Sequence, residues 1–359
     1  MPRSPQARIT RTAISPRLAT SNFSNTRFLS AAAVMVPQAS DGGPSLAGVG
    51  RAAATGSAPA GSAPAAERWF DSVPGTRFDR VAWVAEIGST NTELLRRSDR
   101  AGRPGPARPC GAEGEVLIAD VQTAGRGRRG RAWVAPPGTS LMMSVLLRPP
   151  PAAIAPARAS LVTSAWACAA ADACADVAGV EPRLKWPNDL VVSAGTTDRK
   201  VAGILTESVI ERGAVAALVV GMGLNTGWPA VPAELAGTAT SLNLECGRPV
   251  DRVELARVLL RGFEARYARL CESGDARKLL AEVRRRSATL GRAVRVERDA
   301  AAGGTLAGVA TDVDDDGALV VTDAAGTAHR VDVGDVVHLR PAAAAAPSAG
   351  PSAGPGRAP

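Results

Sequence analysis

Short apolar runs alternate with longer helical patterns through the middle of the chain. Four runs have the length and apolar content of buried strands, and they span residues 81–86, 116–121, 141–147 and 215–220. Two longer segments have the pattern of helices that pack on a sheet: alanine-rich residues 159–177 and amphipathic residues 251–271. Together they predict an α/β (α+β) domain, which we place at residues 76–275.

Polar segments mark where further elements begin or break. Thr90 and Glu93 have the spacing of a capping box at a helix start, and Asp251 and Glu254 repeat it. A polar corner interrupts the apolar strand predicted at residues 184–192. Another strand is expected at residues 201–207, and a basic helix at residues 276–288.

From residue 291 the pattern changes to short alternating stretches separated by Gly or Asp-Gly turns. Five strands are predicted, at residues 294–296, 306–313, 318–322, 327–333 and 336–339. Five strands in so few residues predict a small β-barrel, which we place at residues 288–341.

The two ends lack any sustained periodicity. Residues 1–66 are rich in Ala, Ser, Pro and Arg, and residues 342–359 consist mostly of Ala, Pro, Ser and Gly, so we expect both to be disordered tails. The first 30 residues have the composition of an organelle transit peptide, but the same bias continues along the chain, and Met35 is another candidate start. No helix-turn-helix pattern is found here, so no DNA partner is expected.

Charge and composition narrow the class of protein. The net charge is +8, but residues 1–66 hold six arginines and one aspartate (+5), which leaves 8 − 5 = +3 for the rest. The remaining positive charge is local, at residues 126–131 and 284–286, which fits a small anion better than a long polyanion. No apolar run approaches the ~20 residues of a membrane span. The five cysteines and two histidines lack zinc spacing, and we expect a cytoplasmic protein.

The loop from Gln122 to Arg131 carries the densest chemistry. It reads Gln-Thr-Ala-Gly-Arg-Gly-Arg-Arg-Gly-Arg and follows a predicted strand. Its three glycines let the backbone approach a ligand closely, and its four arginines suit phosphate or carboxylate oxygens. A solvated basic turn or a nucleic-acid patch would explain the loop equally well in isolation.

Other polar residues stand at strand ends, and each has a simple structural alternative. Ser89 and Thr90 could simply cap a helix, and Asn188 and Asp189 could simply form a turn. Lys200 could be a solvated charge at a strand end. The Gly-x-Gly-x-Asn at residues 221–225 does not complete a dinucleotide fingerprint.

Taken in order, these segments resemble the biotin protein ligases. The motifs are Ser89-Thr90-Asn91, the Gln122–Arg131 loop with Trp133 and a Pro-Pro-Gly turn, Lys185-Trp186-Pro187-Asn188-Asp189, and Lys200-Val201-Ala202-Gly203-Ile204-Leu205. The resemblance covers about residues 80–340. It implies a mixed-sheet catalytic domain of the biotin/lipoate ligase type followed by a small SH3-like C-terminal β-barrel.

The resemblance also implies an activity and its partners. Biotin and ATP would form biotinyl-AMP and pyrophosphate, and a lysine of a biotin carboxyl carrier domain of a carboxylase would then take the biotin and release AMP. The protein is expected to be a monomer or a weak homodimer without a membrane partner. Mg²⁺ would be held mainly by the ATP phosphates, and Asp189 could contribute.

The family pattern assigns roles residue by residue. The principal catalytic contacts would be made by Lys200, Arg126 and Asp189, with Asp189 as a candidate acceptor of the lysine proton. Biotin would be bound by Ser89, Thr90, Asn91, Gln122, Arg126, Gly127, Arg128, Lys200 and Gly203. The nucleotide would be bound by Gly125, Arg128, Arg131, Lys185, Trp186, Asn188, Asp189 and Asn225. Arg129 has no assigned role, and Arg340 is a candidate contact from the barrel.

Two rival functions remain in view. A lipoate or octanoate ligase would share the fold and the adenylation chemistry, although the Lys-Trp-Pro-Asn-Asp and arginine-loop motifs resemble the biotin branch. A nucleic-acid-binding module would need exposed aromatic stacking platforms, and one tyrosine and five phenylalanines make these scarce.

Because an acyl-adenylate hydrolyses readily, we also expect the arginine loop to order over it as a lid.

Overall fold

The computed structural model describes residues 10–13, 72–99, 111–194, 197–298, 304–332 and 334–338. Arg340 and the predicted tails at 1–66 and 342–359 lie outside these residues, except for residues 10–13. Thr10–Ala13 form strand β1, which pairs antiparallel with Glu207–Ile210 of β7. No strand was expected there, because four residues are too few to give a periodic signal.

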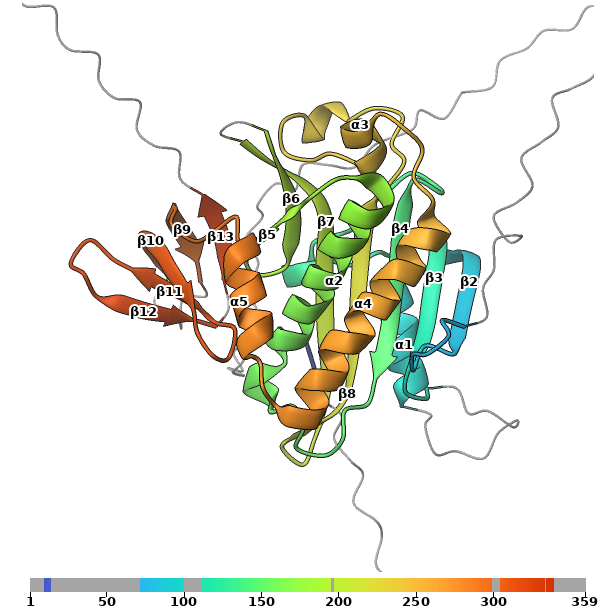
Figure 1. Cartoon of the computed structure of the whole chain (residues 1–359), viewed down its shortest axis with the longest axis horizontal. Coiled ribbons are helices and arrows are strands. Elements are labelled where there is room, and N and C mark those ends of the chain that lie inside the picture. Colours follow the sequence, from blue (N-terminus) through green and yellow to red (C-terminus); the bar gives the residue numbers. More distant parts are fainter. Residues whose placement is uncertain are drawn as a thin grey trace, which may run out of the picture.

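The central sheet has the strand order β2-β3-β4-β8-β7-β6-β5, with β1 attached to β7 (Figure 1). The strands are β2 (Arg80–Ile87), β3 (Glu115–Gln122), β4 (Ser140–Leu147), β5 (Arg183–Lys185), β6 (Asp189–Ala194), β7 (Thr197–Glu211) and β8 (Ala214–Asn225). Strands β2 and β3 run parallel and the other pairs are antiparallel, so the sheet is mixed, as the resemblance implied.

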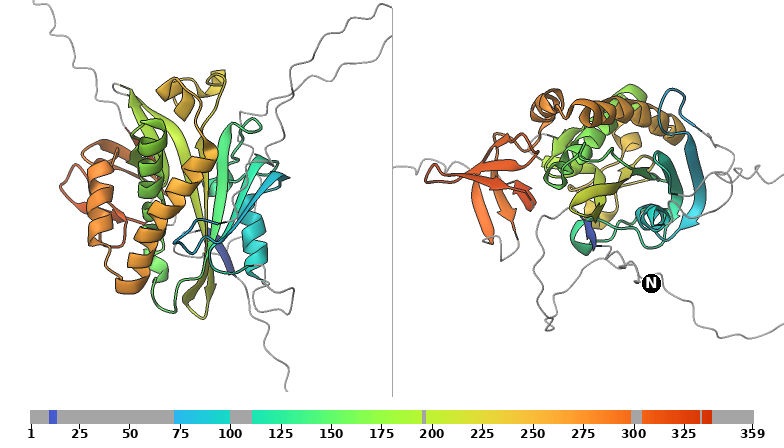
Figure 2. Two further views of the ribbon diagram at one scale, coloured as in Figure 1. Left: turned by 45° about the vertical axis from the view of Figure 1, so that its right-hand side comes forward. Right: turned by 90° about the horizontal axis from the view of Figure 1, so that it is seen from below.

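Helices cover both faces of this sheet. On one face lie α2 (Ser160–Ala178) and α4 (Arg252–Ser273), and α1 (Thr90–Ser98) lies on the other (Figure 2). The alanines of α2 let it pack closely on the strands, and Trp166 of α2 meets Phe263 of α4 edge to face at 4.8 Å. Residues Pro156–Ala178 are long and apolar enough for a membrane span, but this segment is 72% buried within the protein.

The helix starts confirm one prediction and correct another. Asp251 caps α4, and its carboxylate accepts hydrogen bonds from the backbone N–H groups of Val253 and Glu254. The cap of α1 is Ser89 rather than Thr90, because Ser89 has the extended backbone of a cap and its Oγ accepts from Thr92 N. Thr90 is thereby released to turn its hydroxyl toward the sheet.

The C-terminal part is an antiparallel sheet with the order β12-β11-β10-β9-β13. Its strands are β9 (Ala293–Glu297), β10 (Thr305–Val313), β11 (Leu319–Thr322), β12 (Ala328–Val331) and β13 (Asp335–His338). All five predicted strands are present. Among the described residues, the pairing is an open path from β12 to β13 rather than a closed ring.

Two shorter helices complete the described chain. Helix α3 (Leu242–Cys246) follows the segment that leaves β8, and α5 (Arg277–Arg286) joins the two parts. The parts are held together by polar contacts: Trp186 Nε1 donates to Gly317 O at 3.2 Å, and Arg292 pairs with Asp198 at 2.7 Å. The small sheet is thereby fixed beside the polar corner between β5 and β6.

Candidate active site

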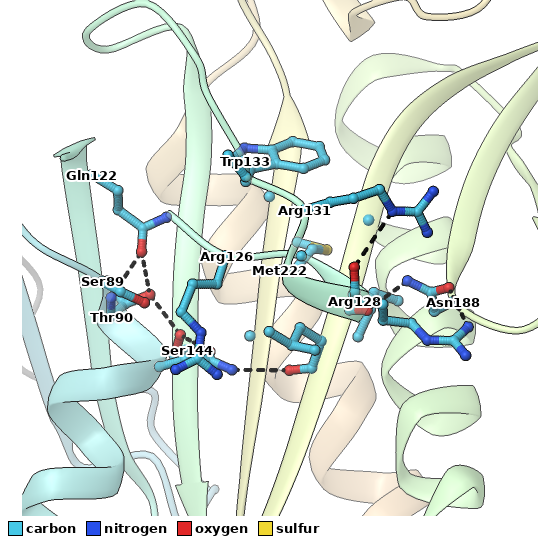
Figure 3. Close-up of a pocket in the computed structure, with 18 of the residues that line it drawn as sticks. Ser89, Thr90, Gln122, Arg126, Arg128, Arg131, Trp133, Ser144, Asn188 and Met222 are labelled. Carbon is cyan, nitrogen blue, oxygen red and sulfur yellow. Dashed lines mark hydrogen bonds between the residues drawn. The ribbon is translucent and has the colours of Figure 1, made fainter. Parts of the chain in front are cut away.

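The predicted biotin residues and the arginine loop meet in one cavity (Figure 3). Its walls come from the start of α1, the end of β3, the loop after β3, and the middles of β7 and β8. The lining comprises Ser89, Thr90, Asn91, Gln122, Arg126, Gly127, Arg128, Arg131, Ala132, Trp133, Ser144, Asn188, Lys200, Gly203, Ile204, Leu205, Gly221, Met222 and Gly223. Neutral polar side chains from Ser89, Thr90, Gln122 and Ser144 gather at one end with Arg126 beside them, and Arg128, Arg131 and Asn188 lie at the other end (Figure 3).

The neutral end is an ordered hydrogen-bond network. Gln122 Oε1 accepts from Thr90 N at 2.8 Å and lies 3.1 Å from Thr90 Oγ1. Because this oxygen is turned toward Thr90, the Gln122 amide nitrogen is left to face the cavity as a donor. The Thr90 hydroxyl also contacts Ser144 Oγ at 2.6 Å. This end can therefore offer oriented donors and acceptors to an uncharged polar ring.

Two glycines of β8 make room for this arrangement. A Cβ atom at Gly221 would stand 1.8 Å from Asn91 Oδ1, and one at Gly223 would stand 2.2 Å from the Trp133 ring. Any side chain at either position would displace these groups. The Gly-x-Gly pattern thus admits side chains into the cavity wall and is not a phosphate loop.

The arginine loop folds back on itself. Gly127 N donates to Arg131 O at 2.6 Å, Trp133 N donates to Gly125 O at 3.0 Å, and Arg126 and Ala132 form an isolated β-bridge. A Cβ atom at Gly125 would meet Trp133 O at 2.3 Å, so this glycine serves the loop's own closure. The loop carries Trp133 to the cavity wall, where its ring centroid lies 5.6 Å from Lys200 Nζ.

The four loop arginines have acceptors from different parts of the protein. Arg126 pairs with Glu207 of β7, and Arg128 Nη1 donates to Asn188 Oδ1 at 3.1 Å. Arg131 pairs with Asp335 of β13 at 3.1 Å, and Arg129 lies 3.8 Å from the same carboxylate. Burial lowers the pKa of Arg128, and the nearby Asp335 and Asp189 carboxylates oppose that shift.

Lys200 lines the same cavity as the arginines. Its Nζ pairs with Asp189 at 2.7 Å, and both side chains are partly exposed. A Cβ atom at Gly203 would come within 3.0 Å of Lys200 Nζ, so the glycine leaves room for the ammonium group. This places an ion pair, the ammonium group of Lys200 and the carboxylate of Asp189, at the edge of the cavity.

Several predicted nucleotide residues lie outside this cavity. Lys185 and Asp189 line a separate recess between α2, the β5–β6 corner and α5. Trp186 borders this recess and also a second cavity, which shares Arg128, Asn188, Ile204 and Leu205 with the first. Asn225 is buried, and its amide donates to Thr240 O at 2.9 Å, so it anchors the segment after β8. Gly125 supports the loop and does not line the cavity. Among the described residues, no cluster of three or more His, Cys, Asp or Glu could hold a metal ion.

Four contributors were not found from the sequence: Ser144, Glu207, Trp133 as a wall of the cavity, and Asp335. Ser144 and Glu207 lie within strands, where a polar residue in an apolar run was the only available signal. Asp335 comes from the C-terminal sheet and gives no local sign of a contact with the loop. Their partners become evident only when distant segments are brought together.

Comparison with known proteins follows the same division of the chain. Residues 112–225 match the biotin/lipoate A/B protein ligase family, and residues 289–339 match the biotin protein ligase C-terminal domain. The biotin–[acetyl-CoA-carboxylase] ligase of Mycobacterium tuberculosis is 38% identical over 271 residues, which cover 74% of this chain and 91% of that protein. The enzyme of the same name from Paracoccus denitrificans is 36% identical, with 68% and 94% covered.

A solved structure supports the fold. The biotin protein ligase from Aquifex aeolicus, in complex with biotin and ATP, superposes with a TM-score of 0.58 at 23% identity and covers 74% of this chain and 100% of its own. The matching domains, the two ligases and the shared fold agree with one another. The chain belongs to the biotin protein ligase family.

Proposed function

We propose that the protein is an ATP-dependent biotin protein ligase that forms biotinyl-AMP and transfers biotin to a carrier-domain lysine. The observation that carries this is the presence, in one cavity, of a neutral hydrogen-bonding network together with the cationic side chains of Arg126, Arg128 and Lys200. Biotin has matching parts, an uncharged ureido ring and a carboxylate. Biotin and ATP are the ligands of the Aquifex aeolicus structure with the same fold.

The first step joins two anions, so it needs fixed positive charge. The biotin carboxylate attacks the α-phosphorus of ATP; a new O–P bond forms, the bond from the α-phosphorus to the bridging oxygen breaks, and pyrophosphate leaves. Arg126, Arg128 and Lys200 converge on the cavity and would offset the repulsion between carboxylate and phosphate. Ser89, Thr90 and Gln122 would hold the ring so that the carboxylate meets these cations.

The second step transfers the acyl group to an amine. The carrier lysine attacks the acyl carbon, the new C–N bond forms, and the C–O bond to AMP breaks. The amine must lose a proton, and Asp189 is the carboxylate closest to Lys200 in the described structure. Asp189 is therefore our candidate for the proton acceptor.

Magnesium fits the donor set only as a companion of ATP. Mg²⁺ is commonly bound through one or two carboxylates together with substrate phosphates. Asp189 could be one such ligand, and no cluster of three or more candidate ligands exists among the described residues. When bound with ATP, Mg²⁺ would neutralise phosphate charge.

Asn91, Arg131 and Asn225 act less directly in this proposal. The hydrogens of the Asn91 amide are used within the protein, Arg131 is paired with Asp335, and Asn225 anchors a loop. Arg131 lines the cavity while its Nη2 is paired with Asp335. Lys185 would border the nucleotide side from its separate recess, and Trp186 would border it from the adjoining cavity that contains Arg128 and Asn188.

The deciding measurement is exchange of labelled pyrophosphate into ATP. Biotin should support exchange, whereas lipoate and octanoate should not. Exchange with lipoate or octanoate but not with biotin would assign the cavity to the related lipoylation chemistry. Transfer should then be followed with an isolated biotin carboxyl carrier domain and with a variant of it in which the acceptor lysine is replaced by arginine.

A further inference from the structure

Glu207 is a buried carboxylate beside the cavity, and the two-step chemistry above gives it no role. Its side chain is only 9% exposed on β7. A carboxylate removed from water is costly unless donors surround it. Here Arg126 Nη2 donates to Oε1, and Asn91 Nδ2 donates to Oε2 at 3.0 Å. Each oxygen is satisfied by a different segment of the chain.

The contact fixes a side chain that would otherwise move freely. Arg126 is 43% exposed, and its second terminal nitrogen donates to Thr92 Oγ1 at 3.3 Å. Glu207 and Thr92 thus hold the two ends of the guanidinium while the side chain still lines the cavity. An arginine oriented before the ligand arrives loses less conformational entropy on binding.

Glu207 also joins the neutral hydrogen-bond network of the cavity to Arg126. Asn91 donates to Leu205 O at 3.1 Å and to Glu207, and its Oδ1 accepts from Ser144 Oγ at 2.6 Å. Ser144 contacts Thr90, which in turn contacts Gln122. One chain of hydrogen bonds therefore runs from the neutral end of the cavity to Arg126, and Glu207 is its last link.

We propose that Glu207 is a positioning residue that fixes Arg126 for the substrate carboxylate, an inference that rests on the proposed function. The chemistry singles out the carboxylate form of this side chain. Both neighbours of Glu207 are donors, and a glutamine has only one acceptor atom, so Glu207→Gln must lose one of the two contacts. Removing the negative charge would by itself strengthen the attraction of the cavity for an anion. We expect the opposite net effect, because the exposed Arg126 side chain then turns into solvent.

The test is a double-mutant cycle on biotin affinity, measured by titration of the full-length protein. Glu207→Gln should weaken biotin binding about 10-fold, the order expected for a hydrogen bond to a charged group. In an Arg126→Ala background, Glu207→Gln should weaken biotin binding less than about 2-fold, because the guanidinium that Glu207 positions is absent. Equal penalties in both backgrounds, or tighter binding by Glu207→Gln, would overturn the proposal.

A ligand without the carboxylate separates the two routes by which Glu207 could act. Biotinamide keeps the ring and has a neutral end, so Glu207→Gln should weaken its binding less than about 2-fold if the effect passes through Arg126. An equal loss for biotin and biotinamide would place the effect at Asn91 and contradict the proposal. Glu207→Asp keeps two acceptor oxygens and should recover part of the lost affinity.

Glu115→Gln is a matched control from the same sheet. Glu115 is a buried strand glutamate, and its oxygens accept from Arg97 Nη1 and Gly111 N, far from the cavity lining. It should lower the melting temperature without changing biotin affinity.

If Glu207→Gln does not fold, Thr92→Val removes the other side-chain hydrogen bond of Arg126. This variant should weaken biotin binding about 2-fold, and only when Arg126 is present. Failure of the unaltered protein to bind biotin would instead count against the proposed function.

Discussion

At the scale of single residues, the cavity depends on an atom that is absent. Gly221 has no Cβ, and a Cβ there would lie 1.8 Å from Asn91 Oδ1 and 3.0 Å from Ser144 Oγ. We expect Gly221→Ala to displace Asn91, to destabilise the fold by about 1–3 kcal/mol, and to weaken biotin binding at least about 10-fold. Thermal unfolding and biotin titration measure the two effects.

Gly262→Ala provides the comparison for that substitution. Gly262 lies in α4, and an added methyl would meet only ordinary contacts at 3.5 Å and beyond. Alanine is also the better helix former, so stability should stay the same or rise slightly. A Gly221→Ala protein that binds biotin as well as the Gly262→Ala protein would contradict the importance of this close approach.

Asp189 is the second residue whose role can be separated experimentally. It holds Lys200 at 2.7 Å and is our candidate proton acceptor. We expect Asp189→Asn to slow transfer from preformed biotinyl-AMP about 100-fold or more, because an amide cannot take the lysine proton. Single-turnover transfer measures this step, and pyrophosphate exchange separately reports whether Lys200 has lost its position. An unchanged transfer rate would remove Asp189 from the role.

Short sequence motifs predicted the cavity residues that belong to those motifs. Thr90, Gln122 and Lys200 stand at the ends of recognisable elements and reach the cavity as expected. Glu207 and Asp335 could not be found in this way. Their partners lie 81 and 204 residues away, and only the strand register and the placement of the second sheet bring them together.

At the scale of elements, strong periodicity predicted which helices and strands are present, but it did not predict the length of every strand. Helices α2 and α4 and strands β3 and β4 lie within a residue or two of their expected bounds. Strand β7 was expected at residues 201–207 but spans Thr197–Glu211. Residues 197–200 are added by pairing with β6 and residues 208–211 by pairing with β8, so strand pairing, not local composition, extends the strand.

The arginine loop is the element whose motion matters most. Its closure over an acyl-adenylate would exclude water, so biotin and ATP together should slow tryptic cleavage at residues 126–131 about 10-fold or more. Cleavage after Arg212, at the exposed turn between β7 and β8, should not change and serves as the internal reference. Equal cleavage of the loop with and without ligands would exclude the lid.

The same experiment tests what holds the empty loop. Arg131 and Arg129 approach Asp335, which belongs to the C-terminal sheet. Asp335→Asn should therefore speed cleavage of the ligand-free loop and have less effect once biotin and ATP are bound. A rate unchanged by Asp335→Asn in the empty protein would show that these exposed ion pairs contribute little, as many surface pairs do.

At the scale of the whole molecule, a partly buried cluster joins the two sheets. His338 of β13 lies 3.1 Å from Asp198 of β7 and 3.2 Å from Arg292, and its other ring nitrogen lies 3.2 Å from Thr289 Oγ1. Burial lowers the pKa of His338, the positive charge of Lys185 lowers it further, and Asp198 opposes the shift. The ring is therefore held neutral between the two parts of the protein.

This cluster predicts a direction for the pH dependence of stability. Because the pKa of His338 is lower in the folded protein, the unfolded chain binds the proton more readily, and stability falls as pH decreases through the ordinary histidine pKa of about 6.5. The pKa of Asp198 is also lowered, but its contribution is lost only below its ordinary value of about 4. Between pH 7.5 and 5.5 the histidine should therefore dominate the contribution of this cluster.

His338→Gln tests the assignment, since glutamine keeps a polar group toward Thr289 and does not titrate. The melting temperature of the unaltered protein should fall between pH 7.5 and 5.5, and the variant should lose part of that fall. His329→Gln is the control, because His329 pairs with the partly exposed Asp323 and lies on β12, at the opposite edge of the small sheet from β13. If His338→Gln leaves the full pH dependence in place, protonation elsewhere weakens the protein, and the junction between the sheets tolerates a charged His338.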